Sequence, residues 1–475
     1  MKKLTRRGFL RLMAAGTGTL FLSSCKKDKT LPVATPTVIT LTPTVIHPSP
    51  VPASTGIMGK ARGIYPGRVA WSYNPKATRW DGKTGTWWQE ENTDQSLVHE
   101  MFSQAIRQIS GKSNDTDAWQ ALFEYFNTNH GIPGVGYIPG EKIAIKVNLN
   151  GCDVREMTKN NSFTSPHVLF ALLNQLVKTA GVPGTDITVY DALRFVPDCI
   201  FDYCHKTEPA SVHFVDWEGG NGREACQRDA NCQVHWSGDV KGNPTYLPTC
   251  VTQAKYLINL ASLKGHNLAG VTLCAKNHFG TIQADWKGKP SQNAPQGANI
   301  HGTIAAHDFS LGEEWTWSQR PMNTYSALVD LMGHPHLGEK TVLFMLDGLY
   351  AAQNQSIEIS NVSRWQAAPF NQGWPSSIFL SQDGVAIDSV GLDFLRNEPT
   401  ILNTPDVLPS NSTCENYLHE AAEADHPASG TVYTPQGNGK TLPKLGVHEH
   451  WNNPKEREYS RNLGTGEGIE LVAIT

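Results

Sequence analysis

The stretch Lys142–Leu149, which reads KIAIKVNL, decides the fold of this chain. A short apolar run rich in Ile and Val is typical of a strand that is buried on both faces. A helix is expected to start at Ser165-Pro166, because serine caps a helix, proline suits its first turn, and apolar residues recur at helical spacing up to Val177. Gly181–Gly184 ends that helix, and Ile187–Tyr190 is the next predicted strand. The order strand, helix, strand is typical of parallel α/β proteins.

The same alternation continues along the chain. Further strands are predicted at residues 211–215, 255–260, 341–346 and 377–380, and helices at 95–109, 118–127, 325–331 and 385–395. Two segments, 217–250 and 281–323, lack periodicity and are expected to form long loops. We therefore predict an α/β fold with a largely parallel sheet flanked by helices, in a single large domain (residues 56–475) with long loop insertions.

The first 25 residues indicate export. Arg6 and Arg7 lie in a segment that resembles the twin-arginine motif, and Leu22–Cys25 resembles a lipobox, in which the cysteine is lipidated. The apolar stretch between them is shorter than the about 20 residues that span a bilayer. An ordinary secretory signal with a chance arginine pair is the alternative. We expect the twin-arginine (Tat) translocon to export the folded chain. The lipid on Cys25 would hold it at the outer face of the cytoplasmic membrane or in the periplasm, as its only membrane attachment.

Residues 26–55 are expected to form a stalk. After a short charged start they read as a Pro/Thr/Val tract, which cannot bury a core and favours extended conformations. The rest of the chain is acidic, because five of the 40 basic residues and none of the 44 acidic residues lie in the first 25 positions. An acidic chain argues against non-specific binding to nucleic acid, which depends on Lys and Arg neutralising phosphates.

The cysteines leave their chemistry open. Eight follow Cys25, and the closest pairs are Cys199/Cys204 and Cys226/Cys232. Disulfides are permitted in an exported chain, and free buried thiols are equally compatible with the sequence. The spacings match neither a zinc ribbon nor a bacterial ferredoxin, so a metal cluster is the less favoured interpretation.

Polar residues follow most of the predicted strands. In an open parallel sheet, ligands bind beyond the carboxyl ends of the strands, so these residues are expected to converge on one crevice. Each of them taken singly could instead be a solvated loop residue. The residues concerned are Lys146, Asn148, Asp191, Lys264, His266, Asp347, Asp383 and Asp388, together with Lys276 and Asn277, which interrupt an apolar segment.

An ordered set of short motifs supports this interpretation. They are Ala144–Asn148 (AIKVN), Ser165–His167 (SPH), Ile258–Leu260 (INL), Leu263–His266 (LKGH), Val271-Thr272, Lys276-Asn277 with Gly280, Leu346–Gly348 (LDG) and Asp383–Asp388 (DGVAID). Together, over roughly residues 140–400, they resemble the DUF362 family, a domain of unknown function often found beside ferredoxin-like iron–sulfur modules. The chain departs from that family where Lys146-Val147-Asn148 replaces the usual Lys-Pro-Asn. It also lacks the Cys-x-x-Cys-x-x-Cys run, so no iron–sulfur cluster is expected.

Other motifs are weaker. His334-Pro335-His336 and His448-Glu449-His450 could each bind a metal through two imidazoles, although both are in predicted loops. Trp87-Trp88 and Trp315-x-Trp317 could stack on sugars, but packing of long loops explains them as well.

The leading hypothesis is an enzyme that acts on a small anionic substrate and could use a divalent metal. Lysines would hold carboxylate or phosphate groups, a histidine would transfer protons, and carboxylates would ligate a hard cation. The expected catalytic residues are Lys264, His266 and Lys276; the substrate-binding residues are Lys146, Asn148, Asp191 and Asn277; and the metal ligands are His266, Asp347, Asp383 and Asp388. The alternatives are a surface protein that binds a small ligand without catalysis, and a maturation or scaffold factor for an exported redox protein.

Overall fold

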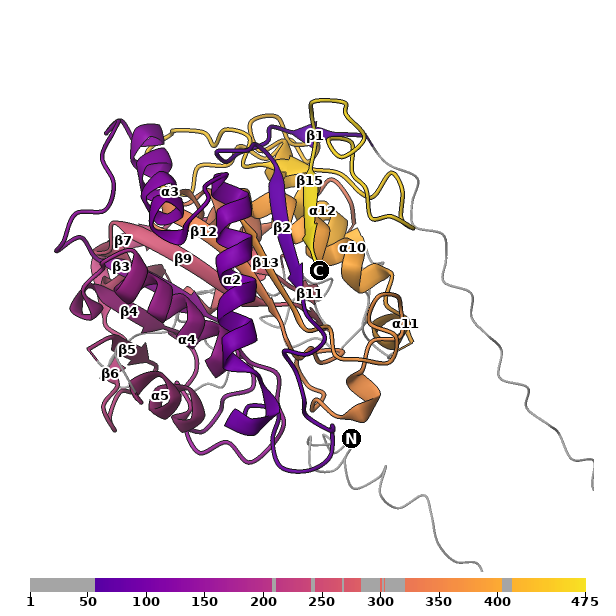
Figure 1. Ribbon diagram of the computed structural model, residues 1–475. Coiled ribbons are helices and arrows are strands. Elements are labelled where there is room, and N and C mark those ends of the chain that lie inside the picture. The colour runs from indigo at the N-terminus through magenta and orange to yellow at the C-terminus, as the bar shows by residue number, and fades with distance from the viewer. Residues whose placement is uncertain are drawn as a thin grey trace, which may run out of the picture. The chain divides into compact units, whose positions relative to one another are not determined.

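The segment that decides the fold forms strand β3 (Ile143–Val147), which is buried along its whole length. In the computed structural model it lies inside a nine-stranded sheet with the order β15-β2-β13-β12-β9-β3-β4-β5-β6 (Figure 1). Its neighbours β9 (Tyr256–Ser262) and β4 (Ile187–Tyr190) run parallel to it. Parallel pairing continues to β12 (Thr341–Gly348) on one side and to β5 (His213–Asp216) and β6 (Glu224–Ala225) on the other. The predicted α/β fold with a largely parallel sheet is confirmed.

The structure describes residues 56–206, 211–240, 244–266, 269–282, 300, 303, 321–403 and 412–475. All of them belong to one compact unit, Pro48–Thr475. The expected twin-arginine signal (1–25) and stalk (26–55) lie outside the described residues, as does most of the predicted loop 281–323. No helix among the described residues is both long enough and apolar enough to cross a membrane.

One strand of the sheet runs against the others. Strand β13 (Ser377–Ser381) pairs antiparallel with β12 and with β2 (Arg68–Tyr73), and β15 (Glu470–Ile474) completes the sheet parallel to β2. In this register Ser377 lies opposite Gly348, and Ser381 lies opposite Val69. The carboxyl end of β13 therefore lies at the edge where the parallel strands begin.

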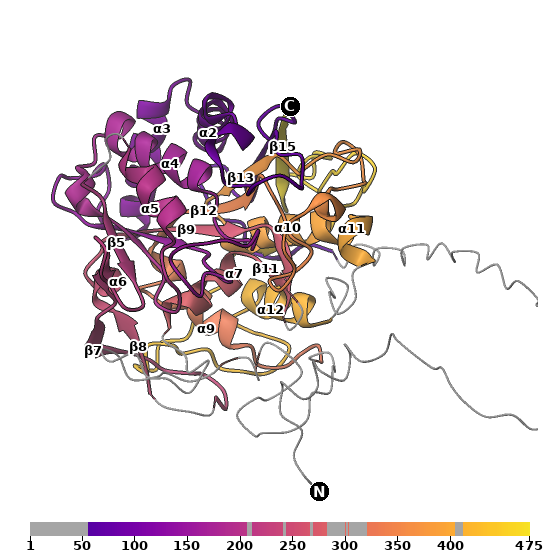
Figure 2. The ribbon, with the colours of Figure 1, turned by 90° about the horizontal axis from the view of Figure 1, so that it is seen from below.

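Helices cover both faces of the sheet (Figure 2). One layer holds α2 (Gln95–Ser110), α3 (Asp115–Asn129), α4 (Pro166–Asn174) and α5 (Asp198–His205). The other holds α7 (Cys274–Asn277), α9 (Ala327–Gly333), α10 (Gly384–Arg396) and α12 (Ser412–Ala422). Along β3, Ile143 and Ile145 enter one hydrophobic core and Ala144 enters the other, as alternation across a sheet requires. Helix α4 begins as predicted, with Pro166 first and the Ser165 hydroxyl accepting a hydrogen bond from the His167 backbone N–H.

Residues 217–250, predicted as a loop, contain regular structure. They hold β6, the antiparallel pair β7 (Arg228–Val234) and β8 (Thr245–Pro248), and the start of α6 (Thr249–Thr252). The prediction was wrong because β7 reads RDANCQV, which carries almost none of the apolar alternation that marks a strand. Other short elements are β1 (Met58–Gly59), β10 (Lys264–His266), β11 (Gly270–Thr272), α11 (Pro399–Leu402), β14 (Val447–His448) and a π-helical turn at Gln175–Thr179. Short 3₁₀ helices lie at Glu90–Asn92, Gly184–Asp186, His278–Thr281, Gly338–Lys340 and Asn361–Ser363.

All eight cysteines after Cys25 lie among the described residues, and each is a free thiol. Five of them are buried, which is the ordinary environment of a cysteine that acts as a small apolar side chain. Of the two interpretations left open by the sequence, free thiols fit the structure.

Candidate functional site

The carboxyl ends of β12, β9, β3 and β4 bring charged residues to one edge of the sheet. Asp347 lies near the end of β12, Lys264 follows β9, Lys146 lies near the end of β3 and Asp191 follows β4. Because these strands are parallel neighbours, four residues that are up to 201 positions apart share this edge. We call Lys146, Lys264, Lys276 and Arg194 the lysine cluster.

Lys146 forms a buried ion pair with Asp191. Its Nζ lies 2.8 Å from Asp191 Oδ2 and also donates to the backbone carbonyl of Val147. The two side chains are 1% and 4% exposed. Burial lowers the pKa of Lys146, and the charge of Asp191 opposes that shift. Asp191 is itself fixed, because its Oδ1 accepts from the backbone N–H of Leu193 at 2.8 Å.

Gly280 lies directly over this ion pair. A Cβ atom at this position would be 2.7 Å from Lys146 Nζ and 2.8 Å from Asp191 Oδ2. The Gly280 carbonyl accepts from the Ala192 backbone N–H at 2.8 Å, so the segment cannot retreat without losing that bond. Glycine is therefore required here by close approach rather than by its backbone conformation.

Asn277 holds helix α7 against the sheet. Its amide donates to Asn259 Oδ1 at 2.8 Å and to the Lys146 carbonyl at 3.3 Å. Asn259, in the middle of β9, in turn donates to the Cys274 carbonyl at 2.9 Å. The side-chain amide of Asn277 is thus used within the protein, next to Lys276, and its expected role in substrate binding stays a prediction. Sequence reasoning missed the contribution of Asn259 to this network, whose signal was a lone amide inside an apolar strand.

Lys264 and Asp347 are both held near neutral pKa values. Lys264 Nζ donates to the Ser162 carbonyl at 2.6 Å, and Asp347 accepts from the backbone N–H groups of Ser165 (2.6 Å) and Leu349 (3.1 Å). Burial lowers the pKa of Lys264 to about 7, against the opposing influence of Cys152 and Asp347. Burial raises the pKa of Asp347 to about 6, although its hydrogen bonds and Lys264 oppose this.

Lys276 is a further lysine of the cluster that lacks a carboxylate partner among the described residues. Its Nζ lies 4.1 Å from the centre of the Phe279 ring. Burial lowers its pKa to about 7, and the positive charges of Arg194, Lys146 and Lys264 act in the same direction. Among the described residues, neither Lys264 nor Lys276 has a carboxylate within ion-pair distance. Lys146 is paired with Asp191 and Arg194 lies 3.7 Å from Asp153, so Lys264 and Lys276 are the members of the cluster that lack a carboxylate partner among the described residues.

Further polar atoms at this edge lack hydrogen-bond partners among the described residues. They include Oδ1 of Asn148, which follows β3, and Oγ of Ser262, which ends β9. The backbone of Asn148 is tied to Thr164, whose hydroxyl accepts from the Asn148 N–H at 2.8 Å. Asn148, expected to bind substrate, is thus rigidly placed at the cluster's edge with its side-chain carbonyl unused.

Asp383 and Asp388 do not belong to this arrangement. The expectation that Asp383 shares a crevice with Lys264 and Asp347 is wrong, because β13 runs antiparallel and ends at the opposite edge. Its carboxylate caps α10 through Val385 and Ala386 and also accepts from the backbone N–H groups of Arg62 and Val447. The Asp388 carboxylate accepts from the N–H groups of Cys274 and Ala275 and from the Tyr417 hydroxyl. Both carboxylates are occupied in holding the fold together.

The four expected metal ligands do not lie close together. His266 lies in the β10–β11 hairpin, where its Nδ1 accepts from the Ala269 N–H at 3.2 Å. A metal site of this kind needs at least three His, Cys, Asp or Glu side chains close together. Among the described residues, the group that meets this condition is Glu415, His419 and His448. The set of His266, Asp347, Asp383 and Asp388 is therefore not a metal centre in this structure. The catalytic role of His266 stays a hypothesis.

The other motifs have ordinary surroundings. The ring of Trp87 packs 4.9 Å from that of Phe163, and Trp88 packs 5.2 Å from the same ring, which fits loop packing. His334 Nδ1 accepts from the His336 N–H, and His336 Nδ1 lies 2.9 Å from Lys340 Nζ. Trp315 and Trp317 lie outside the described residues.

A cavity of about 400 Å³ lies towards the opposite edge of the sheet. Its lining includes Arg62, Tyr125, His130, Thr341, Gln382 and Lys444. Thr341 begins β12 and Gln382 follows β13, which places the cavity towards the amino ends of the parallel strands. Sequence reasoning missed it, because its residues come from distant segments that share no motif. Among the described residues that line it, Arg62 is paired with Glu339 and Lys444 with Glu423.

Comparison with known proteins gives a family match but no named relative. No curated protein is significantly similar to the chain. A family model described as "Domain of unknown function (DUF362)" matches residues 143–393, from the start of β3 to the last turn of α10.

Proposed function

The chain belongs to the DUF362 family, and we propose that its lysine cluster binds a small carboxylate- or phosphate-bearing substrate on which the protein carries out proton transfer. The observation that carries the proposal is the uncompensated charge of Lys264 and Lys276. Among the described residues these two lysines have no carboxylate partner, whereas nearby Lys146 is paired with Asp191. A bound anion would supply the missing negative charge and relieve the repulsion between the cations.

The proton-transfer part of the proposal rests on Lys264 and Asp347. A general acid or base is most effective when its pKa lies near the working pH. The pKa values of about 7 for Lys264 and about 6 for Asp347 meet that condition, and each side chain is oriented by hydrogen bonds to the backbone. Lysine with a lowered pKa is a known general base in proteins.

Isothermal titration calorimetry of the purified protein tests the binding step. Inorganic phosphate, acetate and a panel of phosphorylated and carboxylated metabolites would be titrated at pH 6.5. We expect at least one class of anion to bind, and Lys276→Met to weaken that binding at least tenfold, which corresponds to about 1.4 kcal/mol.

Lys340→Met is the matched control. Lys340 is a buried lysine whose Nζ donates to the carbonyls of Val251 (2.9 Å) and Ala254 (2.6 Å) and to His336 Nδ1 (2.9 Å), so its three ammonium hydrogens are in use and none is left for a ligand. Its replacement should leave anion affinity unchanged. Absence of binding across the panel, or equal loss in both variants, would show that the cluster is not an anion site.

Incubation of the protein with the bound anion in D₂O tests whether the protein is an enzyme or only binds the anion. Proton transfer to carbon would introduce deuterium, which mass spectrometry detects, and Lys264→Met should abolish the exchange. Binding without any chemical change would favour the alternative of a surface protein that captures a small ligand.

We further propose that the chain is exported in folded form and anchored by lipid. The support is the Arg6-Arg7 pair and the lipobox ending at Cys25, which lie outside the described residues. Replacing both arginines with lysine should block export, and Cys25→Ala should release soluble protein outside the cell. Unchanged export of the lysine variant would rule out the twin-arginine route.

A further inference from the structure

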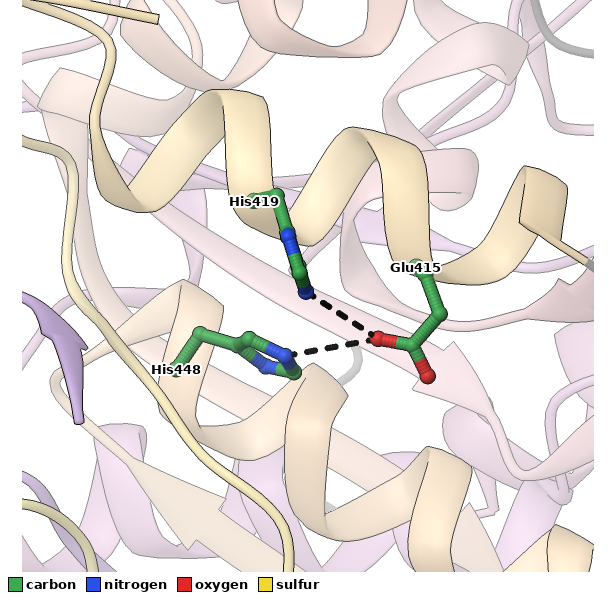
Figure 3. Close-up of side chains that lie close together, drawn as sticks. All are labelled: Glu415, His419 and His448. Atoms are coloured by element: carbon green, nitrogen blue, oxygen red, sulfur yellow. Dashed lines mark ion pairs between the residues drawn. The ribbon is translucent and has the colours of Figure 1, made fainter. Parts of the chain in front are cut away.

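A second buried polar cluster lies away from the lysine cluster, between α12 and β14. Glu415 and His419 are one turn apart on α12, and His448 reaches them from β14 (Figure 3). We call these three residues the histidine–glutamate cluster. One ligand atom from each lies within 4.8 Å of the others. Glu415 Oε2 is 3.5 Å from His419 Nε2 and 3.4 Å from His448 Nε2.

The hydrogen bonds of His448 fix where its lone pair lies. Ser389 Oγ donates to the Val385 carbonyl at 2.7 Å, so its hydrogen is already used. The 2.8 Å contact between Ser389 Oγ and His448 Nδ1 must then be donated by the imidazole, which places the ring hydrogen on Nδ1. In the neutral ring, Nε2 therefore directs a lone pair at the Glu415 carboxylate.

This arrangement is unfavourable as it stands. His448 is fully buried, and neither its Nε2 nor that of His419 has a hydrogen-bond partner among the described residues. Two acceptors that face each other across 3.4 Å, away from water, repel unless a cation lies between them. The cluster thus lacks a positive charge at the point where its three ligand atoms converge.

The spacing fits a metal ion better than a hydrogen bond. An N–H···O bond would bring the heavy atoms to about 2.9 Å. A tetrahedral ion with bonds of about 2.0–2.2 Å holds its ligand atoms about 3.3–3.5 Å apart. The observed separations of 3.4 Å and 3.5 Å match the second value.

The residues around the cluster hold its ligands in place. Arg396 binds Glu415 Oε1, and His450 Nε2 bridges the two carboxylate oxygens, 3.0 Å from Oε1 and 3.1 Å from Oε2, while Oε2 also faces His419 and His448. His450 Nδ1 lies 2.7 Å from Asp393, whose other oxygen accepts from the Tyr459 hydroxyl. Hydrogen-bonded supports of this kind are typical of metal sites, where they set the orientation of each ligand.

We propose that Glu415 Oε2, His419 Nε2 and His448 Nε2 bind one divalent metal ion of the zinc class, with a fourth position left for water or a ligand. Two imidazoles and a carboxylate are a ligand set that zinc accepts. The side chains of His419 and Glu415 are 18% and 14% exposed, whereas His448 is not exposed, so the ion would enter from the α12 side. The inference does not depend on the function proposed for the lysine cluster.

Metal titration of the full chain after treatment with a chelator tests the proposal. We expect one Zn²⁺ per chain by calorimetry, and a four-coordinate visible spectrum when Co²⁺ is added instead. His419→Gln should weaken Zn²⁺ binding by more than the about 10–100-fold that the loss of an outer hydrogen-bond partner costs. His419 is partly exposed, so this variant should remain folded, which its circular dichroism spectrum would verify.

His426→Gln is the matched control, because His426 lies soon after α12 and its side chain is 89% exposed. It should bind Zn²⁺ like the parent protein. If the folded parent binds no Zn²⁺, or if His419→Gln binds it as tightly as the parent does, the metal site does not exist and the cluster is a purely structural contact.

Discussion

The lysine cluster and the histidine–glutamate cluster differ in the sign of the charge that each leaves unmatched. In the first, the buried Lys264 and the partly buried Lys276 have no carboxylate partner among the described residues. In the second, His419 and His448 present unpartnered ring nitrogens to a carboxylate oxygen. Within the described part of the chain, the first lacks an anion beside its two unpaired lysines, and the second lacks a cation between its three ligand atoms, although Arg396 pairs with Glu415 from the other side. What distinguishes a binding site from a structural contact is therefore the interaction that is missing, more than the types of residue present.

Asp383, in contrast to the unpartnered groups of both clusters, is a buried polar group whose hydrogen bonds are all made within the protein. Its carboxylate accepts from four backbone N–H groups, those of Arg62, Val385, Ala386 and Val447. Asp383→Ala should lower the free energy of unfolding by about 3 kcal/mol or more, since each buried donor left unpaired costs about 1–3 kcal/mol. Denaturant unfolding measures this loss. The folded fraction should bind anions and Zn²⁺ like the parent, and altered binding would place Asp383 in a functional site after all.

Replacement by methionine should change the stability of the protein in opposite directions at Lys340 and at Lys276. Lys340→Met leaves three backbone carbonyls without their donor and should destabilise the protein by about 1–3 kcal/mol. Lys276→Met removes repulsion from Arg194, Lys146 and Lys264 and should raise the melting temperature by about 1–3 °C in the absence of anion. Differential scanning calorimetry of both variants checks the contrast. A lower melting temperature for Lys276→Met would mean that its charge is already compensated.

The lysine cluster should also depend on pH in a defined direction. Lys264 and Lys276 have pKa values of about 7 in the folded chain, below the ordinary lysine value. Between about pH 7 and that ordinary value the unfolded chain binds more protons, so these groups make the free energy of unfolding rise with pH. Anion affinity should change the other way above pH 7 and fall up to about tenfold per pH unit for each of the two lysines that the anion needs protonated. Calorimetric titrations at several pH values would show this, and a flat profile would contradict it.

The smallest expected effect concerns the support of the metal ligand His448. Ser389→Ala removes the acceptor of the His448 Nδ1–H and frees the ring to change tautomer. Zn²⁺ affinity should fall about tenfold, at the lower end of the range for such partners, because the hydroxyl is neutral. Zn²⁺ competition with a chromophoric chelator measures it. An unchanged affinity would show that the tautomer of His448 is set by something else.

The sequence contains enough local information to predict the β3–α4–β4 unit. The cap Ser165, the first-turn Pro166 and the terminating glycines are short-range signals, and the structure confirms them. The meeting of Lys146, Asp191, Lys264 and Asp347 then follows from parallel geometry alone. Strand direction, in contrast, has no local signal. Asp383 was misplaced because β13 followed by α10 reads like the other strand–helix units although it runs the opposite way.

The histidine–glutamate cluster could not be predicted for a different reason. Its residues come from a helix and a distant two-residue strand, and only the tertiary fold places them together. The sequence motif His448-Glu449-His450 indicates a candidate metal site through its two imidazoles. Alternation along the extended segment, however, turns Glu449 away from His448 and His450. Its carboxylate instead accepts from the Ser460 hydroxyl and the Ile469 backbone N–H.

Helix α10 connects the two regions through adjacent residues. Asp388 holds the start of α7, which carries Lys276, while Ser389 holds His448. Thermodynamic linkage makes any communication along this helix reciprocal: if Zn²⁺ changes anion affinity by some factor, the anion must change Zn²⁺ affinity by the same factor. If α10 is rigid, occupation of one site leaves the affinity of the other unchanged and the two sites are independent. If α10 shifts on binding, this helix couples the two sites allosterically.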